Sequence, residues 1–223
     1  MLEFWMLKDT DRYSYFLNEA YSDAKIQVED FTIPVHRLVL CSQSEYFAKA
    51  LQGDFSESLC KTLTCPPQKE PAYIRMLEYL YTGSYSDEKS DILGRKGAQP
   101  HIDILDRSST DTTTDDNELM KDARVYFLAD SFFLPGLKEF SLGKFRSRIA
   151  ALWTSEELAD CIAEIYENTV SEDDGIRAAI IDTVKSHCKE LLTRRPFLAL
   201  VEAGGSFASD LVRILSEHGR TWY

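Results

Sequence analysis

The chain has 223 residues, which is enough for one large domain or two small ones, and its formal net charge is −12. Hydrophobic residues make up 44% and aromatic residues 12%, the composition of a globular protein rather than a disordered one. Because so acidic a chain repels phosphate backbones and no basic stripe compensates locally, direct binding to nucleic acid is not expected.

The cysteines and histidines argue against a metal site. Five cysteines and four histidines are spread along the chain without a Cys-x-x-Cys pair, although metal sites need ligands that converge. Reduced thiols are expected, as in an intracellular protein. The apolar stretch at the N-terminus meets charge at Lys8 and is followed by no cleavage site of small residues, so it predicts neither a signal peptide nor a membrane span. The sequence thus predicts a soluble protein of the cytoplasm or nucleus, with no cofactor and no membrane contact.

The first expected elements are a short helix and a β-hairpin. Residues 11–21 carry a hydrophobic face that predicts a short helix ending near Tyr21. Two runs of alternating apolar residues follow in KIQVEDFTIPV and predict the hairpin. Pro34 has no amide proton, so it is expected at the end of a strand.

A pair of helices is expected next. Residues 38–41 are apolar nearly all round, which predicts a short and deeply buried helix. Ser42 and Glu45 fit a capping box, S-x-x-E, in which each side chain accepts a hydrogen bond from an amide of the first turn, so they are expected to open the second helix. Gly53 supplies a left-handed stop at its end.

The following segments predict a third strand and a longer helix. The strand is expected at KTLTCP and the helix at EPAYIRMLEYLYTG, with Pro71 in its first turn and Gly83 just past its end. The residues expected on the buried face of this helix are Ile74, Leu77, Leu80 and Tyr81.

The composition changes from Ser86 to Asn117, where serine, threonine, aspartate and glycine accumulate and aromatic residues vanish. A flexible insertion at about 86–117 is therefore expected. Two helices, broken at Leu134-Pro135, follow it, and the remainder of the chain is predicted to be wholly helical.

The helical remainder carries apolar residues at helical spacing. Thr154 and Glu157 fit a second capping box and are expected to open the first helix of this part. The residues expected to face inward are Leu158, Ile162, Ile165, Tyr166, Ile176, Ile180, Val184, Leu191, Phe207, Leu211, Ile214 and Leu215.

No residue is predicted to be catalytic. A nucleophilic triad of His36, Ser42 and Asp23 is an alternative, but the sequence has no strained G-x-S-x-G turn to present the serine. Cys41 lies on a face predicted to be buried, where a thiol stays protonated and unreactive. The glycine pair near the C-terminus lacks the lysine that follows in a phosphate-binding loop. The sequence therefore favours a protein that binds rather than one that catalyses.

Three residues are candidates for a protein interface, and each has two interpretations. Asp23 and Arg37 form either a local ion pair or helix cap, or part of a charged groove in which a desolvated pair sets the choice of partner. Phe55 either closes the helical pair against the core or protrudes as an anchor for a partner.

Four segments follow one another along the chain: YSDAKIQV, FTIPVHRLVLCSQSEYFAKAL, GDFSES and MLEYLYTGSY. They match, block by block and in order, the run S-D-x-x-φ, H-[KR]-x-V-L-x-x-x-S-x-x-F, G-x-F-x-E-S and φ-L-x-Y-[IL]-Y-T-G, so the chain resembles a BTB/POZ domain protein. The later segment RVYFLADSFFLPGLKEFSLGKF resembles the closing helical pair of that domain, especially in the short fungal BTB proteins with a helical C-terminal tail.

The resemblance implies an α/β (α+β) fold, in which a small sheet is flanked by helical hairpins and followed by an all-helical C-terminal extension. It implies an N-terminal extension over residues 1–20 and the BTB/POZ domain over 21–149, with the flexible insertion inside it. A helical C-terminal region over 150–223 completes the expected organisation.

The resemblance also implies a non-enzymatic protein–protein interaction module. Family members dimerise or act as substrate adaptors that dock on a cullin scaffold of a ubiquitin ligase, so the expected partner is a protein, a cullin or a second copy of the chain. Adaptor members often carry a hydrophobic-x-Glu motif after the fourth strand, and the equivalent residues here are Tyr85 and Asp87, with aspartate in place of glutamate. Asp23 and Arg37 fall on the charged pocket at the dimer groove of transcription-factor members, so an oligomerisation scaffold in nuclear regulation is the alternative function.

Overall fold

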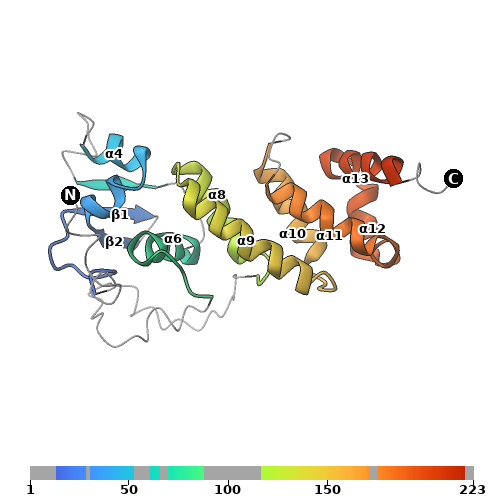
Figure 1. Cartoon of the computed structure of the whole chain (residues 1–223), viewed down its shortest axis with the longest axis horizontal. Coiled ribbons are helices and arrows are strands. Elements are labelled where there is room, and N and C mark those ends of the chain that lie inside the picture. The colour runs from blue at the N-terminus through green and yellow to red at the C-terminus, as the bar shows by residue number, and fades with distance from the viewer. Residues whose placement is uncertain are drawn as a thin grey trace. The chain divides into compact units, whose positions relative to one another are not determined.

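The structure is a computed structural model that describes residues 14–28, 31–52, 61–65, 70–87, 117–170 and 175–218. The chain divides into two compact units (Figure 1). The first unit consists of Met1–Asp116 and Arg124–Lys138, and the second consists of Asn117–Ala123 and Glu139–Tyr223. The predicted insertion at 86–117 lies outside the described residues from position 88 to position 116.

A three-stranded sheet lies in the first unit, with strands β1 (Ala24–Val28), β2 (Phe31–Val35) and β3 (Thr62–Thr64) in the order β2-β1-β3. Strands β1 and β2 are antiparallel, which confirms the predicted hairpin, and β1 and β3 are parallel. Ile26 of β1 lies opposite Ile33 on one side and Leu63 on the other, and all three side chains are buried. Apolar residues at every second position therefore give the sheet one buried face.

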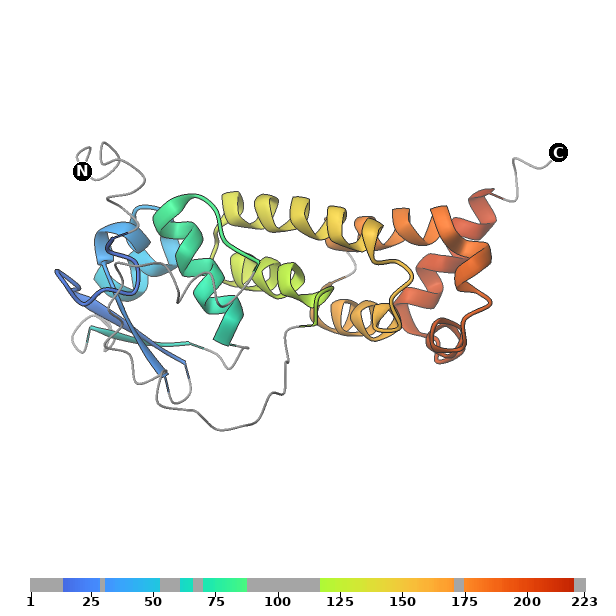
Figure 2. The same cartoon turned by 90° about the horizontal axis from the view of Figure 1, so that it is seen from below.

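In its described residues the first unit also contains the helices α3 (Arg37–Cys41), α4 (Glu45–Gln52), α6 (Glu70–Thr82) and the greater part of α8 (Met120–Ser131). The predicted helical pair after the hairpin is confirmed by α3 and α4, and the longer helix by α6. The deep burial predicted for residues 38–41 is wrong, because Leu38 is 49% exposed and Cys41 is only partly buried, so α3 turns one side to the surface. In Figure 2 the blue and green helices of this unit lie on one side of its strands. The fold class is the expected α+β class, a small sheet combined with helices.

The predicted capping box at the start of α4 is wrong, because the cap falls two residues later. The Ser42 hydroxyl donates to Val39 O, 3.1 Å away, and closes the end of α3. Ser44 Oγ instead accepts the hydrogen bond of the Phe47 amide, at 3.2 Å, which is the bond of an N-cap. Ser44 Oγ also donates to Phe132 O at 2.6 Å. One buried hydroxyl therefore caps α4 and ties it to the end of α8.

Helix α6 is buried on more sides than its amphipathic pattern predicts. The four residues predicted for its buried face are indeed buried, and so are Ala72, Tyr73, Arg75, Met76 and Glu78. Gly83, with φ of +79°, ends the helix, and its amide donates to Tyr79 O at 2.7 Å. Two charged side chains, Arg75 and Glu78, therefore lie inside the unit and must find polar partners there.

An aromatic cluster holds the helices of the first unit together. The rings of Phe47 and Phe132 stack with their centroids 5.0 Å apart. Tyr46 and Tyr73 meet the Phe132 ring edge-on, at 5.1 and 6.2 Å. Since aromatic pairs of this geometry add to the free energy of burial, Phe132 fixes the end of α8 against α4 and α6.

The helix predicted for residues 11–21 is wrong within the described part, from residue 14 onward, which forms turns. The Asn18 side chain donates to Ser14 O at 3.0 Å and accepts the Ala20 amide at 2.9 Å. These bonds offer the backbone an alternative to helical pairing. Leu17 and Tyr21 adopt positive φ angles of 56° and 63°, which a helix does not allow.

The second unit is helical throughout its described part, as predicted. Its helices are α9 (Pro135–Ala151, from Glu139 onward), α10 (Leu158–Asn168), α11 (Ile176–Leu191), α12 (Arg195–Glu202) and α13 (Gly205–His218). Helix α10 contacts α11, α12 and α13 (Figure 1). The break at Leu134-Pro135 is confirmed, and α12 is a helix that the sequence pattern did not reveal.

The inward-facing residues predicted for the second unit are buried with two exceptions: Leu215 is exposed, and the Ile214 side chain lies outside the described residues. The second predicted capping box is wrong. Helix α10 begins at Leu158, and the Glu157 amide donates to Ser155 Oγ at 3.2 Å instead of completing a box with Thr154.

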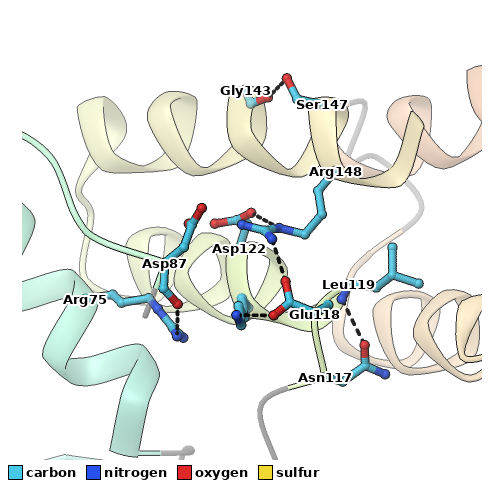
Figure 3. A network of polar contacts seen from close by, with 10 residues as sticks. Arg75, Asp87, Asn117, Glu118, Leu119, Asp122, Gly143, Ser147 and Arg148 are labelled. Atoms are coloured by element: carbon cyan, nitrogen blue, oxygen red, sulfur yellow. Dashed lines mark hydrogen bonds and ion pairs between the residues drawn. The ribbon is translucent and has the colours of Figure 1, made fainter. Parts of the chain in front are cut away.

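A polar network anchors α9 within the second unit (Figure 3). Arg148 Nε donates to Asp122 Oδ2 at 2.8 Å, and its Nη1 donates to Glu118 Oε2 at 2.7 Å. Lys121 pairs with the same Glu118. Asp122 is fully buried, so the Arg148 guanidinium supplies the charge that makes its burial tolerable.

We expect replacement of Ser44 by alanine to lower the free energy of unfolding by about 1–2 kcal/mol, because both the cap of α4 and the bond to α8 are lost. Urea denaturation of the full chain measures this loss. Ser42→Ala is the matched control, since among the described residues its exposed hydroxyl bonds only to Val39 O of α3, and its effect should stay within about 0.5 kcal/mol. Equal losses in the two variants would contradict the cap at Ser44.

Candidate protein-interaction site

Two surfaces of the first unit hold the described candidate residues. The first, which we term the α3 entrance, consists of Tyr21, Asp23 and His36–Leu38. The second, which we term the post-α6 segment, consists of Ser84–Asp87. Phe55, the remaining candidate, lies outside the described residues.

Asp23 caps the N-terminus of α3 from the end of the preceding segment. Its Oδ1 accepts the hydrogen bond of the Arg37 amide at 2.8 Å, while the N-cap residue, His36, makes no side-chain cap of its own. The Asp23 amide donates to Val35 O at 3.3 Å, which holds the carboxylate in place beside β2. A carboxylate at this position also complements the positive end of the short helix. Among the described residues no ion pair joins the side chains of Asp23 and Arg37, so the helix cap is the local role that the geometry supports.

His36 is held at both ring nitrogens. Its Nε2 lies 2.8 Å from Ala20 O, and its Nδ1 lies 2.7 Å from the Tyr81 hydroxyl oxygen. A backbone carbonyl can only accept, so the hydrogen of the neutral ring lies on Nε2, and the Tyr81 hydroxyl donates to Nδ1. The same hydroxyl oxygen accepts the His36 amide at 3.0 Å. Burial raises the pKa of the Tyr81 hydroxyl well above its usual range, which keeps this donor protonated.

Exposed apolar side chains adjoin this polar cluster. Tyr21 is 83% exposed and Leu38 is 49% exposed. The Tyr15 ring lies edge-on to both Tyr21 and His36, with centroids 6.2 and 5.7 Å apart. The α3 entrance thus combines an aromatic ring, an aliphatic side chain and the charged Arg37, a mixture typical of protein interfaces.

The post-α6 segment is fastened to α6 by three polar side chains. Thr82 Oγ1 donates to Ser84 O at 2.7 Å and accepts the Ser84 amide at 3.2 Å. Glu78 Oε2 accepts the amide and the hydroxyl of Ser86, at 2.9 and 3.0 Å. Arg75 Nη2 donates to Asp87 O at 3.2 Å (Figure 3). A segment without regular secondary structure is therefore held by bonds to a buried helix.

The orientation of this segment separates its two candidate residues. Tyr85 is only 5% exposed and packs into the unit, whereas Asp87 is exposed. The accessible surface of this segment is therefore formed by Ser84, Ser86 and Asp87, and Tyr85 anchors the segment beneath it. The assignment of Tyr85 and Asp87 to a docking motif stays a prediction.

The roles of several residues that adjoin these surfaces were missed by the sequence reasoning. Tyr81 was predicted to be buried, but its hydrogen bonds to His36 were not predicted, and neither were the burial of Glu78 and its bonds to Ser86. Phe133, in the turn between α8 and α9, is 67% exposed and has a φ of +52°. An exposed bulky residue in this conformation is uncommon, but the pattern of apolar residues gives no sign of it.

The alternative catalytic arrangements are not assembled. Asp23 bonds to a backbone amide, His36 bonds to Tyr81 and Ala20, and the Ser42 hydroxyl bonds to Val39 O. Burial raises the pKa of the Cys65 thiol to about 12, which keeps it from acting as a thiolate. Within the described ranges no cluster of three or more histidine, cysteine, aspartate or glutamate residues is arranged to hold a metal ion. The helices in those ranges are also too short or too polar to span a bilayer.

Comparison with known proteins identifies the first part of the chain. Residues 13–95 match the family model of the BTB/POZ domain. Over 84 residues the chain is 37% identical to BTB/POZ domain-containing protein 9 of Drosophila melanogaster, a match that covers 35% of this chain and 12% of that protein. Over 98 residues it is 31% identical to Rho-related BTB domain-containing protein 2 of Homo sapiens, covering 41% of this chain and 14% of that protein.

The match confirms the resemblance inferred from the four sequence motifs. A BTB/POZ domain is a protein-interaction module, and both described surfaces lie within residues 13–95. The chain spans only 12 to 14% of the length of these relatives, so the activities of the whole relatives do not transfer with the match. The predicted boundaries at residues 21 and 149, and the kinship of the helical tail, stay predictions.

We expect Tyr81→Phe to lower the free energy of unfolding by about 1–2 kcal/mol, because the amide and Nδ1 of His36 both lose their partner. Hydrogen exchange at the His36 amide should accelerate in the same variant. Tyr15→Phe is the matched control, since the Tyr15 ring also contacts His36 but its hydroxyl makes no hydrogen bond in the described part of the chain. Its effect should stay within about 0.5 kcal/mol, and a larger one would argue against the assignment to Tyr81.

Proposed function

We propose that this protein, whose residues 13–95 form a BTB/POZ domain, is a substrate adaptor that docks on a cullin scaffold of a ubiquitin ligase. In this role the chain performs no chemistry itself. The post-α6 segment meets the scaffold, and a second surface of the chain recruits the protein to be modified.

The observation that carries the proposal is the fixed geometry of the post-α6 segment. Adaptor members of the family often dock through a hydrophobic-x-Glu motif, and Tyr85 and Asp87 occupy its positions here. Arg75 and Glu78 hold this segment before any partner arrives, so little conformational entropy remains to be lost on binding. Aspartate is one methylene shorter than glutamate, and it preserves the charge of the motif but reaches less far.

The acidic character of the chain is consistent with this mode of binding. The net charge of −12 and the exposed Asp87 favour a partner surface that carries basic groups. Complementary charges raise the rate of association and suppress wrong partners more than they raise affinity.

We expect the purified full chain to bind the N-terminal region of a cullin with a Kd at or below micromolar, the range of a transient interface. Asp87→Lys should weaken binding at least about tenfold, because the contact of the Asp87 carboxylate with the cullin is lost and a repulsive charge takes its place. Isothermal titration calorimetry measures both affinities. Glu202→Lys, at an exposed residue of α12, makes the same change of charge and should leave the Kd unchanged. Absence of binding at micromolar concentration would refute the adaptor function.

A second function, that of an oligomerisation scaffold, is favoured by the α3 entrance. Tyr21 and Leu38 expose apolar surface beside Arg37, and their burial against a second copy would remove that surface from water. Asp23 and Arg37 would then lie at the groove between the copies.

We expect a scaffold to elute as a stable dimer, with its mass measured by light scattering behind a sizing column. Leu38→Asp should convert that dimer to a monomer, because the substitution places a charge in an apolar contact. A monomeric wild-type chain that binds a cullin would contradict the scaffold, whereas a dimer that ignores cullins would support it.

A further inference from the structure

The Glu78 carboxylate is a buried negative charge beside the post-α6 segment. Glu78 is 3% exposed, and within the described residues the hydrogen bonds to its carboxylate all come from Ser86. The Ser86 amide lies 2.9 Å from Oε2, and its hydroxyl lies 3.0 Å from Oε2 and 3.3 Å from Oε1. The hydroxyl donates, so its hydrogen is what makes the contact attractive.

We propose that Ser86 is a phosphorylation site, and that its phosphate releases the post-α6 segment from Glu78. The proposal rests on the proposed function for its consequence, which is that modification switches docking off. The release itself is a property of this chain and does not depend on a cullin.

Ser86 is accessible to an acidophilic serine/threonine kinase. Its residue is half-buried, and its segment has no regular secondary structure. The side-chain bonds from Arg75, Glu78 and Thr82 and the packing of Tyr85 must open before the segment enters a kinase cleft. In the sequence Ser86 is followed directly by Asp87 and Glu88, the acidic context that such kinases read through basic pockets. In the reaction the Ser86 oxygen attacks the γ-phosphorus of ATP, the bond to the β-phosphate oxygen breaks, ADP leaves, and the hydroxyl proton passes to the base of the kinase.

Phosphorylation reverses the sign of the contact with Glu78. The modification removes the donated hydrogen and adds a charge of about −1.5 to −2 with three acceptor oxygens. Two anions then face each other at a distance set by a former hydrogen bond, next to a carboxylate that water barely reaches. Moving the segment outward relieves the repulsion, and the bond from Arg75 to Asp87 O is lost with it.

Arg75 is the group that opposes release of the post-α6 segment. Its guanidinium is buried and already reaches the end of the same segment, so a phosphate that turned inward would meet a cation. Such capture would tighten the segment, whereas repulsion by Glu78 loosens it. The direction of the change in amide exchange at residue 86 therefore distinguishes capture by Arg75 from repulsion by Glu78.

Ser84 provides the matched control. It lies two residues away in the same segment and is exposed, and the described bonds at this residue involve its backbone rather than its hydroxyl. A phosphate there adds the same charge without facing Glu78.

The first experiment installs phosphoserine at position 86 or 84 of the full chain by genetic encoding and measures amide exchange by NMR, normalised to unstructured peptides. Phosphorylated Ser86 should raise the exchange rate of its own amide at least about tenfold, because that amide loses the Glu78 acceptor. Phosphorylated Ser84 should change the rate at residue 86 by no more than about twofold. Unchanged or slower exchange with phosphorylated Ser86 would overturn the proposal, and slower exchange would indicate capture by Arg75.

A second variant isolates the repulsion. In Glu78→Gln the neutral amide can donate to a phosphate, so phosphorylation of Ser86 should no longer accelerate exchange in that background. An equal acceleration with and without the Glu78 charge would overturn the mechanism.

The kinase step is tested separately. The folded chain and a peptide spanning residues 80–92 are incubated with an acidophilic kinase and ATP, and fragmentation mass spectrometry locates the phosphate. Phosphate on Ser86 in both the folded chain and the peptide supports the assignment of the site. Failure of the folded chain while the peptide is modified, or failure of both, would overturn it.

Binding of the phosphorylated chain to the N-terminal region of a cullin tests whether the modification switches docking off. Phosphorylated Ser86 should weaken that binding at least about tenfold, the factor that matches the loss of one charge-assisted contact. If the unmodified chain does not bind, the adaptor function is refuted. The exchange experiment still tests whether phosphorylation releases the segment from Glu78. If the unmodified chain binds and phosphorylated Ser86 binds equally well, the switch fails and the adaptor function stands.

Discussion

Burial of α6 on nearly every side is the constraint on which the first unit depends. A helix at the surface turns its polar residues to water, but α6 turns two charged residues and two tyrosines into the protein. Each of these side chains needs a polar partner, since an unsatisfied buried group costs more than a hydrogen bond returns. The segments that provide the partners are thereby fixed in position.

Both candidate surfaces follow from this constraint. At the α3 entrance the Tyr81 hydroxyl accepts the His36 amide and donates to the His36 ring, which in turn holds Ala20. At the post-α6 segment Glu78 holds Ser86. The Gln43 side chain adds a further tie by donating to Leu80 O at 2.7 Å. The polar residues around α6 therefore hold both candidate surfaces in place. Of the residues that suggested a triad, His36 is occupied in these bonds, while Asp23 caps α3 and Ser42 bonds to Val39 O.

Patterns of apolar residues predicted the elements because each pattern depends on local geometry. The hairpin at β1 and β2, the breaks at Gly83 and at Leu134-Pro135, and the stripes of the second unit follow from periodicities and from backbones that glycine and proline permit.

The predictions were wrong where a polar side chain can form a hydrogen bond with more than one local partner. Ser42 and Ser44 both fit the start of α4, and the choice depends on where α3 ends and on the position of Phe132, which lies far away in the sequence. Asn18 likewise prefers turn contacts to a helix. The burial of Tyr85 and the exposure of Phe133 depend on tertiary packing, which the spacing of residues along the sequence does not predict.

The proposed docking and the proposed phosphorylation switch place opposite demands on the post-α6 segment. A docking surface gains affinity from rigidity, because an ordered segment loses little entropy when it binds. Rigidity from a large apolar core would resist any covalent switch, since no single modification offsets many buried contacts. Here Tyr85 supplies the apolar anchor, and the rest of the order comes from a few bonds to Arg75, Glu78 and Thr82. Such polar networks are stable when complete and fail when one member changes charge. A segment built in this way is ordered enough to be recognised and remains sensitive to a change at one hydroxyl.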